Sequence, residues 1–166
     1  MRVLVTGATG FVGRHLCRDL VANNFSVRAL VRGSPHQNLL TGVESQYGDL
    51  TDSRVVRIAT RDIDVIIHLA ARVHVIHDTA TDPLSEFRHA NVEGTRILAA
   101  AAGESGVKHI VFVSSVKAVG GASSTLWTSA TPPDPVDAYG ISKLEAERAL
   151  LGTQSDRQPA VTVLRF

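Results

Sequence analysis

The chain has 166 residues, of which 44% are apolar and 20% charged, and its formal net charge is +1. This length predicts one globular domain of ordinary size with its own core. The small net charge and the absence of a basic run argue against a nucleic-acid-binding protein, and no apolar run is long enough to span a membrane.

The first predicted element is a short buried strand over residues 3–5. Met1 leads almost directly into it, so no signal peptide is visible and we expect a cytoplasmic protein. Three glycines follow the strand at Gly7, Gly10 and Gly13, and a helix is predicted after them. A glycine turn between a strand and a helix predicts dinucleotide binding, with phosphates at the helix N-terminus. The spacing is G-x-x-G-x-x-G rather than the more general G-x-G-x-x-G.

Strands and helices are predicted to alternate along the rest of the chain. Apolar runs predict further strands at 27–31, 64–69, 108–114 and 161–165, and a short strand also fits 44–47. Periodic segments predict helices at 11–23, 52–60 and 84–102, and a last one that Asp134-Pro135-x-Asp137 opens and that ends near Leu151. This alternation predicts an α/β fold, a doubly wound and mostly parallel sheet of Rossmann type with helices on both faces.

The single cysteine, Cys17, lies in the first predicted helix, where we expect a buried apolar residue, and it excludes an internal disulfide. The polar segment 71–83 is a candidate binding loop. It contains His74 and His77, whose short spacing suggests a metal site, but no third ligand is evident and no metal is expected. The chain ends at Phe166, directly after a predicted strand, so we expect an NAD(P)-binding domain over 1–166 that lacks a C-terminal substrate-binding part.

Tyr139 and Lys143 lie four residues apart in the last predicted helix and therefore on one face of it. The pKa of a tyrosine hydroxyl is ordinarily about 10, which is too high for a base at neutral pH. A neighbouring ammonium favours the phenolate and lowers this pKa. The pair is thus a candidate acid–base site, and the alternative is a solvated helix face without chemistry.

Six motifs in order resemble the extended class of short-chain dehydrogenases/reductases that act on nucleotide sugars. They are the glycine turn Thr6-Gly7-Ala8-Thr9-Gly10-Phe11-Val12-Gly13, then Gly48-Asp49-Leu50, His68-Leu69-Ala70-Ala71, Asn91-Val92-Glu93-Gly94-Thr95, Phe112-Val113-Ser114-Ser115 and the pair Tyr139 and Lys143. The resemblance covers essentially the whole chain, and the T-G-x-x-G-x-x-G turn of this class accounts for the glycine spacing.

The resemblance implies cofactor-binding roles for the glycine turn, for segments that follow strands and for two helix residues. These are Gly7, Thr9, Gly10, Phe11, Val12, Gly13, Asp49, Leu50, Leu69, Ala70, Ala71, Asn91 and Lys143. Asp49 is expected to contact the adenine amine, and Asn91 to support the structure around the site.

The resemblance also implies a catalytic trio. Tyr139 would exchange the proton of a sugar hydroxyl or ketone, and Ser115 would hydrogen-bond the same oxygen as charge develops on it. Lys143 would hold the nicotinamide ribose and lower the pKa of Tyr139. A hydrolase is the weaker interpretation of these residues, because the chain contains no G-x-S-x-G elbow.

The cofactor is predicted from the end of the second strand, where NAD-preferring folds carry an acid. This chain has Val31 and then Arg32 there, with Arg28 nearby. An arginine suits a 2′-phosphate, so NADP is favoured over NAD. The alternative, in which Arg32 stacks over adenine or is merely solvated, stays open.

The expected reaction is the epimerisation or 4-keto reduction of a nucleotide sugar, with hydride transfer at C4. Val116-Lys117 follows Ser115, where the dehydratase branch carries an Asp-Glu pair, and this disfavours a dehydratase. The alternative function is a dinucleotide-binding module or truncated enzyme half without turnover. We expect a nucleotide-sugar substrate, no nucleic-acid or membrane partner, and a homodimer as a candidate assembly.

Overall fold

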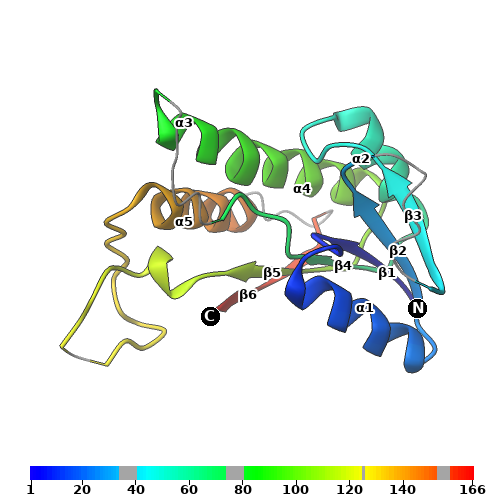
Figure 1. Cartoon of the computed structure of the whole chain (residues 1–166), viewed down its shortest axis with the longest axis horizontal. Helices are drawn as coiled ribbons and strands as arrows, with labels where there is room; N and C mark the ends of the chain where they lie inside the picture. Colours follow the sequence, from blue (N-terminus) through cyan, green and yellow to red (C-terminus); the bar gives the residue numbers. More distant parts are fainter. Residues whose placement is uncertain (34–40, 74–80, 125, 153–157) are drawn as a thin grey trace.

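A computed structural model of the chain contains one six-stranded sheet between helices (Figure 1). The structure describes residues 1–33, 41–73, 81–124, 126–152 and 158–166. The strands are β1 (Arg2–Thr6), β2 (Ser26–Val31), β3 (Val43–Tyr47), β4 (Val65–His68), β5 (His109–Ser114) and β6 (Ala160–Arg165). The helical segments are α1 (Phe11–Ala22), α2 (Ser53–Ala59), α3 (Pro83–Phe87), η1 (Arg88–Glu93), α4 (Gly94–Glu104), η2 (Val116–Ala118) and α5 (Ala138–Leu151).

All six strands are parallel, in the order β3-β2-β1-β4-β5-β6. The chain first builds outward from β1 through β2 to β3, then returns to the other side of β1 with β4. In open parallel sheets the crevice at such a reversal binds the ligand, outside the carboxyl ends of the strands. Here the reversal lies between β1 and β4, where Thr6 is in register with His68.

Helices cover both faces of the sheet, as the sequence predicts (Figure 1). On one face α1 packs against alternate residues of β1 and β2, and Cys17 is fully buried among them. Burial raises the pKa of its thiol to about 11, so the predicted apolar role of Cys17 is confirmed. On the other face α2, α4 and α5 cover a larger core, in which Leu4, Ile66 and Ile110 come from three neighbouring strands.

The long helix predicted at 84–102 is interrupted. It begins as α3, widens into the π-helix η1 over Arg88–Glu93, and continues as α4 to Glu104. A π-helix accommodates an extra residue in a helix and frequently marks a functional site. Hydrophobic periodicity does not reveal such an insertion, because each flanking helix keeps its own apolar stripe.

The last long helix begins three residues later than predicted. Asp137, not Asp134, is the N-cap of α5, and its Oδ1 accepts a 2.7 Å hydrogen bond from the amide of Gly140. The amide of Asp134 instead donates to the carbonyl of Val119 over 2.6 Å, which keeps the segment before Asp137 outside the helix.

No helix among the described residues is both long and apolar enough to cross a bilayer.

Gly13 brings α1 close to the glycine turn. A Cβ at this position would lie 2.7 Å from the Cα and 2.9 Å from the carbonyl carbon of Ala8, and would also collide with the carbonyl oxygen of Gly7. All these atoms belong to the backbone, so a side chain can be accommodated only if the helix moves.

Gly13→Ala is therefore expected to destabilise the fold by about 1–3 kcal/mol, the usual cost of overpacking. Gly103→Ala in α4 is a matched control, because the atoms nearest to its Cβ would be the end of the flexible Gln158 side chain, and alanine favours a helix. Urea unfolding followed by circular dichroism measures both. Equal stabilities for the two variants would contradict this account of Gly13.

Candidate active site

The glycine turn lies directly against the end of β4. Gly7 has a φ of +71°, and a Cβ there would lie 2.7 Å from the amide nitrogen of Ala70 and 2.8 Å from the carbonyl carbon of Leu69. The amide of Gly10 donates to the carbonyl of Gly7 over 3.1 Å and closes the turn. Two segments predicted to bind the cofactor, 7–13 and 69–71, are thus brought together at the reversal point of the sheet.

The turn leaves the N-terminus of α1 open. Gly10 is the N-cap and supplies no side-chain cap. Phe11 is 84% exposed, and Thr9 and Val12 are also exposed. Uncapped first-turn amides at the positive end of a helix suit an anionic phosphate.

Asp49 lies in the turn after β3, next to the end of β2. Its Oδ1 accepts hydrogen bonds from the amide and the hydroxyl of Thr51, at 2.9 and 2.8 Å. These bonds lower the pKa of Asp49, and the nearby charge of Arg32 lowers it further. Arg32 and Asp49 therefore lie in one electrostatic neighbourhood, whereas Leu50 packs into the core beside Gly94.

Arg28 does not share this neighbourhood. Its Nη1 donates to the carbonyl of Ala59, the last residue of α2, at 2.9 Å and to that of Arg61 just beyond it at 2.8 Å, and its Nε is 3.0 Å from Glu44. The guanidinium satisfies carbonyls at a helix C-terminus, where a cation is favourable. Of Arg28 and Arg32, the two arginines that the sequence places near the end of the second strand, only Arg32 is exposed.

Asn91 sits in the π-helix with a fully engaged side chain. Its Oδ1 accepts from the amide of Arg72 at 2.7 Å, and its Nδ2 donates to the carbonyl of Arg72 at 3.2 Å and to Ser142 Oγ at 2.9 Å. Ser142 in turn donates to the carbonyl of Tyr139 over 2.8 Å. Since Asn91 is buried, this geometry favours the supporting role over direct contact with a cofactor.

Ser115 and Tyr139 meet at the carboxyl end of β5. Ser115 is the N-cap of η2, and its Oγ accepts from the amide of Lys117 at 3.3 Å. Burial raises the pKa of the Tyr139 hydroxyl, whereas the hydrogen bond with Ser115 and the charge of Lys117 lower it. Asp137 opposes Lys117, which it holds at 2.7 Å. The net pKa of Tyr139 is above its ordinary value.

Lys143 takes a different position from the one that the sequence suggests. Its side chain is buried, its Nζ donates to the carbonyl of Val113 over 2.8 Å and lies 4.0 Å from the ring centroid of Phe112. Burial lowers the pKa of Lys143 to about 7, partly offset by Glu147. A buried ammonium needs a nearby acceptor, and the β5 carbonyl provides it. The lysine whose charge acts on Tyr139 in this structure is Lys117, which the sequence prediction did not include.

A partly buried ion pair fixes α5 to the ends of two strands. Glu147 in α5 accepts hydrogen bonds from the guanidinium of Arg165 in β6, at 3.0 and 2.6 Å, and from the hydroxyl of Ser114 in β5. Glu147 is one helical turn after Lys143. The pair therefore fixes the position of α5, with its candidate site residues, relative to the sheet.

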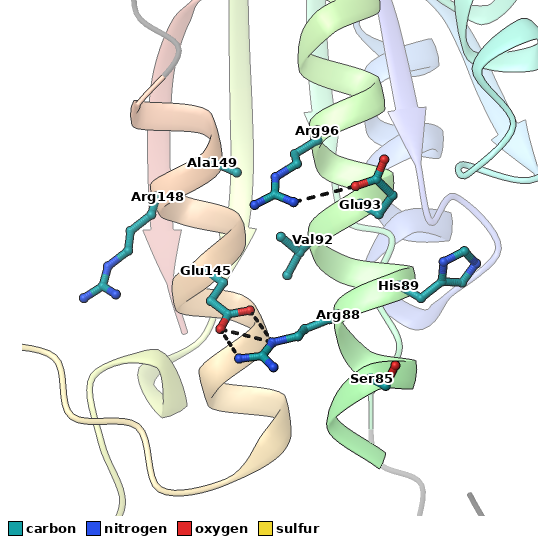
Figure 2. A pocket seen from close by; sticks show the side chains of 9 residues that line it. All are labelled: Ser85, Arg88, His89, Val92, Glu93, Arg96, Glu145, Arg148 and Ala149. Carbon is teal, nitrogen blue, oxygen red and sulfur yellow. Dashed lines mark hydrogen bonds and ion pairs between the residues drawn. The ribbon is translucent and has the colours of Figure 1, made fainter. Parts of the chain in front are cut away.

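A groove of about 760 Å³ lies away from these residues, between α5 and the continuous helical segment α3–η1–α4 (Figure 2). It is lined by Ser85, Arg88, His89, Val92, Glu93, Arg96, Glu145, Arg148 and Ala149. Arg88 binds Glu145 across it with both its Nε and Nη2. None of the site residues predicted from sequence lines this groove.

Among the residues that the structure describes, no three histidine, cysteine or acidic side chains are placed to hold a metal ion. His74 and His77, the pair considered as metal ligands, lie outside the described residues, as does much of the candidate loop 71–83.

Known proteins resemble this chain in sequence. Residues 3–166 match the model of the NAD dependent epimerase/dehydratase family. The UDP-glucose 4-epimerase of Vibrio cholerae is 35% identical over 98% of the chain and 50% of its own length. The human dTDP-D-glucose 4,6-dehydratase is 34% identical over 88% of the chain and 45% of its own length. The chain spans about half the length of these relatives.

Solved structures resemble it in fold. MoeE5 in complex with UDP-glucuronic acid and NAD aligns with a TM-score of 0.87 at 32% identity, over the whole chain and 54% of its own length. DesIV of Streptomyces venezuelae, a dTDP-glucose 4,6-dehydratase with NAD and TYD bound, gives a TM-score of 0.86 at 28% identity, over 99% of the chain and 55% of its own length. With a family match over nearly all its residues, the chain belongs to the NAD-dependent epimerase/dehydratase family.

Proposed function

We propose that the chain forms the dinucleotide-binding and acid–base part of an NAD(P)-dependent epimerase or 4-keto reductase that acts at C4 of a nucleotide sugar. The observation that carries this proposal is the meeting of Ser115 and Tyr139 at the carboxyl edge of the sheet that also presents the glycine turn. Relatives named as UDP-glucose 4-epimerases support it.

Tyr139 is the proposed proton-exchanging group. Its hydroxyl is protonated at neutral pH, because its pKa is above the ordinary value, and it can donate to a ketone oxygen during reduction. Ser115 hydrogen-bonds the same oxygen and stabilises the charge that develops there. In the reverse direction the charge of Lys117 favours the phenolate that removes a hydroxyl proton.

The residues present fit a dinucleotide. The uncapped amides of α1 would hold the pyrophosphate, and the ionised Asp49 is an acceptor for the adenine amine. Lys143 would hold the nicotinamide ribose, which requires its ammonium to leave the carbonyl of Val113. When bound, the nicotinamide supplies the hydride or accepts it.

NADP is the proposed preference, with NAD as the alternative. The exposed Arg32 directly follows β2, at the position where NAD-preferring folds carry an acid, and a guanidinium suits a 2′-phosphate. The solved relatives named above carry NAD, which favours the alternative.

An epimerase or reductase is proposed over a dehydratase. Val116 and Lys117 follow Ser115, and neither supplies a carboxyl group like those of the Asp-Glu pair that the dehydratase branch carries there. Lys117 is instead paired with Asp137. Because the human relative is named a dehydratase, dehydration should be assayed together with epimerisation and 4-keto reduction.

A second candidate is a dinucleotide-binding module with little turnover of its own. It is favoured by the share of the relatives that the chain covers, about half. A substrate-binding part beyond 1–166, cytoplasmic localisation and a homodimer stay predictions. Rapid turnover of a UDP-sugar by the 166-residue chain would reject the module.

Tyr139→Phe is expected to lower turnover of a nucleotide sugar by the complete protein about 10²-fold or more, because the proton-exchanging hydroxyl is lost. NAD(P) affinity should change little. Steady-state kinetics and calorimetric titration of the cofactor measure the two effects, with Tyr47→Phe as the matched control. Rates like those of the unsubstituted protein would remove Tyr139 from the mechanism.

Lys117→Met is expected to raise the pKa of Tyr139, because it removes a favourable charge and leaves the Asp137 carboxylate unpaired nearby. The chain has two tyrosines, so a Tyr47→Phe background isolates Tyr139 in a tyrosinate absorbance titration. Lys108→Met, which alters an exposed pair with Asp64, is the control. A pKa that does not rise would refute the role of Lys117.

Arg32→Asp is expected to shift cofactor preference from NADP towards NAD, because a carboxylate repels the 2′-phosphate and accepts from the ribose 2′-hydroxyl. Arg18→Asp makes the same charge change at an exposed position of α1. The ratio of the two dissociation constants, measured for each variant, is the readout. An unchanged ratio in Arg32→Asp would exclude the 2′-phosphate as its partner.

A further inference from the structure

His68, at the end of β4, is buried between two threonines from different elements. Its Nδ1 is 2.6 Å from the hydroxyl oxygen of Thr6 in β1, and its Nε2 is 3.0 Å from that of Thr95 in α4. The ring packs against Phe112, with centroids 5.3 Å apart. His68 thus joins the strand before the glycine turn to the helix that follows the π-helix.

The hydroxyl of Thr95 determines the direction of this hydrogen-bond chain. It donates to the carbonyl of Asn91 over 2.5 Å, and a hydroxyl has one hydrogen to give. Its oxygen therefore accepts from His68, which must carry a proton on Nε2. The Nδ1 of the neutral ring is then an acceptor and receives the hydroxyl hydrogen of Thr6.

Thr6 satisfies the other end. Its oxygen accepts a 3.1 Å hydrogen bond from the amide of Ala70, so it can donate its own hydrogen to His68. Each donor in this chain, from the amide of Ala70 through Thr6, His68 and Thr95 to the carbonyl of Asn91, then has one acceptor.

The surroundings of His68 keep the ring neutral. Burial lowers its pKa to about 3, and the ammonium of Lys143 adds to the effect. A protonated ring would direct a second donor at Thr6, whose oxygen already accepts from Ala70. The described elements that pack against the ring contribute no carboxylate to this shift.

The run of hydrogen bonds ends at the backbone carbonyl of Asn91, and the side-chain amide of the same residue begins a second run that reaches the candidate catalytic helix. The side-chain amide of Asn91 donates to Ser142, which donates to the carbonyl of Tyr139 in the first turn of α5. Ala70, beside the glycine turn, and Tyr139 are therefore linked through buried groups of defined donor direction.

We propose that His68, with its proton on Nε2, is a positioning residue that holds the glycine-turn side of the site and the Tyr139 side in fixed relation. It touches neither substrate nor cofactor and acts through Thr95 and Asn91. This inference rests on the proposed function in so far as Tyr139 is the acid–base group, but its tests need neither cofactor nor sugar.

The first test is the protonation state of the ring in the unsubstituted 166-residue chain. Long-range ¹⁵N–¹H NMR distinguishes the two neutral forms and the cation, and His68→Phe identifies the His68 signals among the seven histidines. We expect one neutral form with the proton on Nε2, unchanged between about pH 5 and 9. A proton on Nδ1, a mixture of the two forms, or titration in this range would overturn the proposal.

The second test removes the acceptor of Nε2–H. Thr95→Val in the Tyr47→Phe background removes the hydroxyl that binds the backbone carbonyl of Asn91. It should loosen the backbone of Asn91, displace the side chain that holds Ser142, weaken the bond between Ser115 and Tyr139, and so raise the pKa of Tyr139. The Nε2 proton of His68 should exchange faster with solvent. The conservative Thr95→Ser should restore both values.

Thr60→Val is the matched structural control. Thr60 is equally buried and its hydroxyl is 2.9 Å from that of Ser105, outside the His68 chain. We expect Thr60→Val to lower the melting temperature about as much as Thr95→Val does, without a change in the Tyr139 titration. If Thr95→Val left the titration unchanged, or if Thr60→Val shifted it equally, the positioning role would be rejected. Loss of turnover in Tyr139→Phe would still stand, so the two proposals fail separately.

Discussion

The backbone of the glycine turn passes so close to the end of β4 that no side chain fits between them. This contact places the N-terminus of α1 over the point where the strand order reverses, and it requires the left-handed backbone of Gly7. The rest of the site depends on it. Thr6 and Ala70 flank the contact, and their hydrogen bond begins the buried chain that leads to α5.

Although β3 (Val43–Tyr47) is mostly polar, much of the fold is predictable from sequence, because a parallel sheet covered on both faces needs apolar strands, and apolar runs are visible at β1, β4 and β5. Two features are not. The π-helix at Asn91 leaves no periodic signal, and the tertiary hydrogen bonds of Asn91 to the backbone of Arg72 cannot be read from sequence. The start of α5 predicted from sequence is wrong, because Asp134 and Asp137 can both cap a helix. The hydrogen bond from Asp134 to Val119, which distinguishes them, is visible only in the structure.

The candidate site divides in the same way. A motif predicts which residues line the site, but not the rotamer that a long side chain adopts. Lys143 shows this, because its ammonium binds a β5 carbonyl. Lys117 could have been noticed, as one of three lysines and two residues after Ser115. His68 is visible in the sequence at the end of an apolar strand, but its hydrogen-bonding role becomes evident only when its partners in β1 and α4 are known.

The π-helix also constrains how the chain can change in length. A π-helix absorbs one extra residue without changing the faces that the flanking helices present. Deleting a residue from 88–93 would therefore let this segment close into a regular α-helix and would remove the wide turn from which Asn91 reaches Ser142. Insertions and deletions are tolerated in surface loops, but we expect natural relatives to keep the spacing between Phe87 and Thr95 constant even where the sequence between them varies.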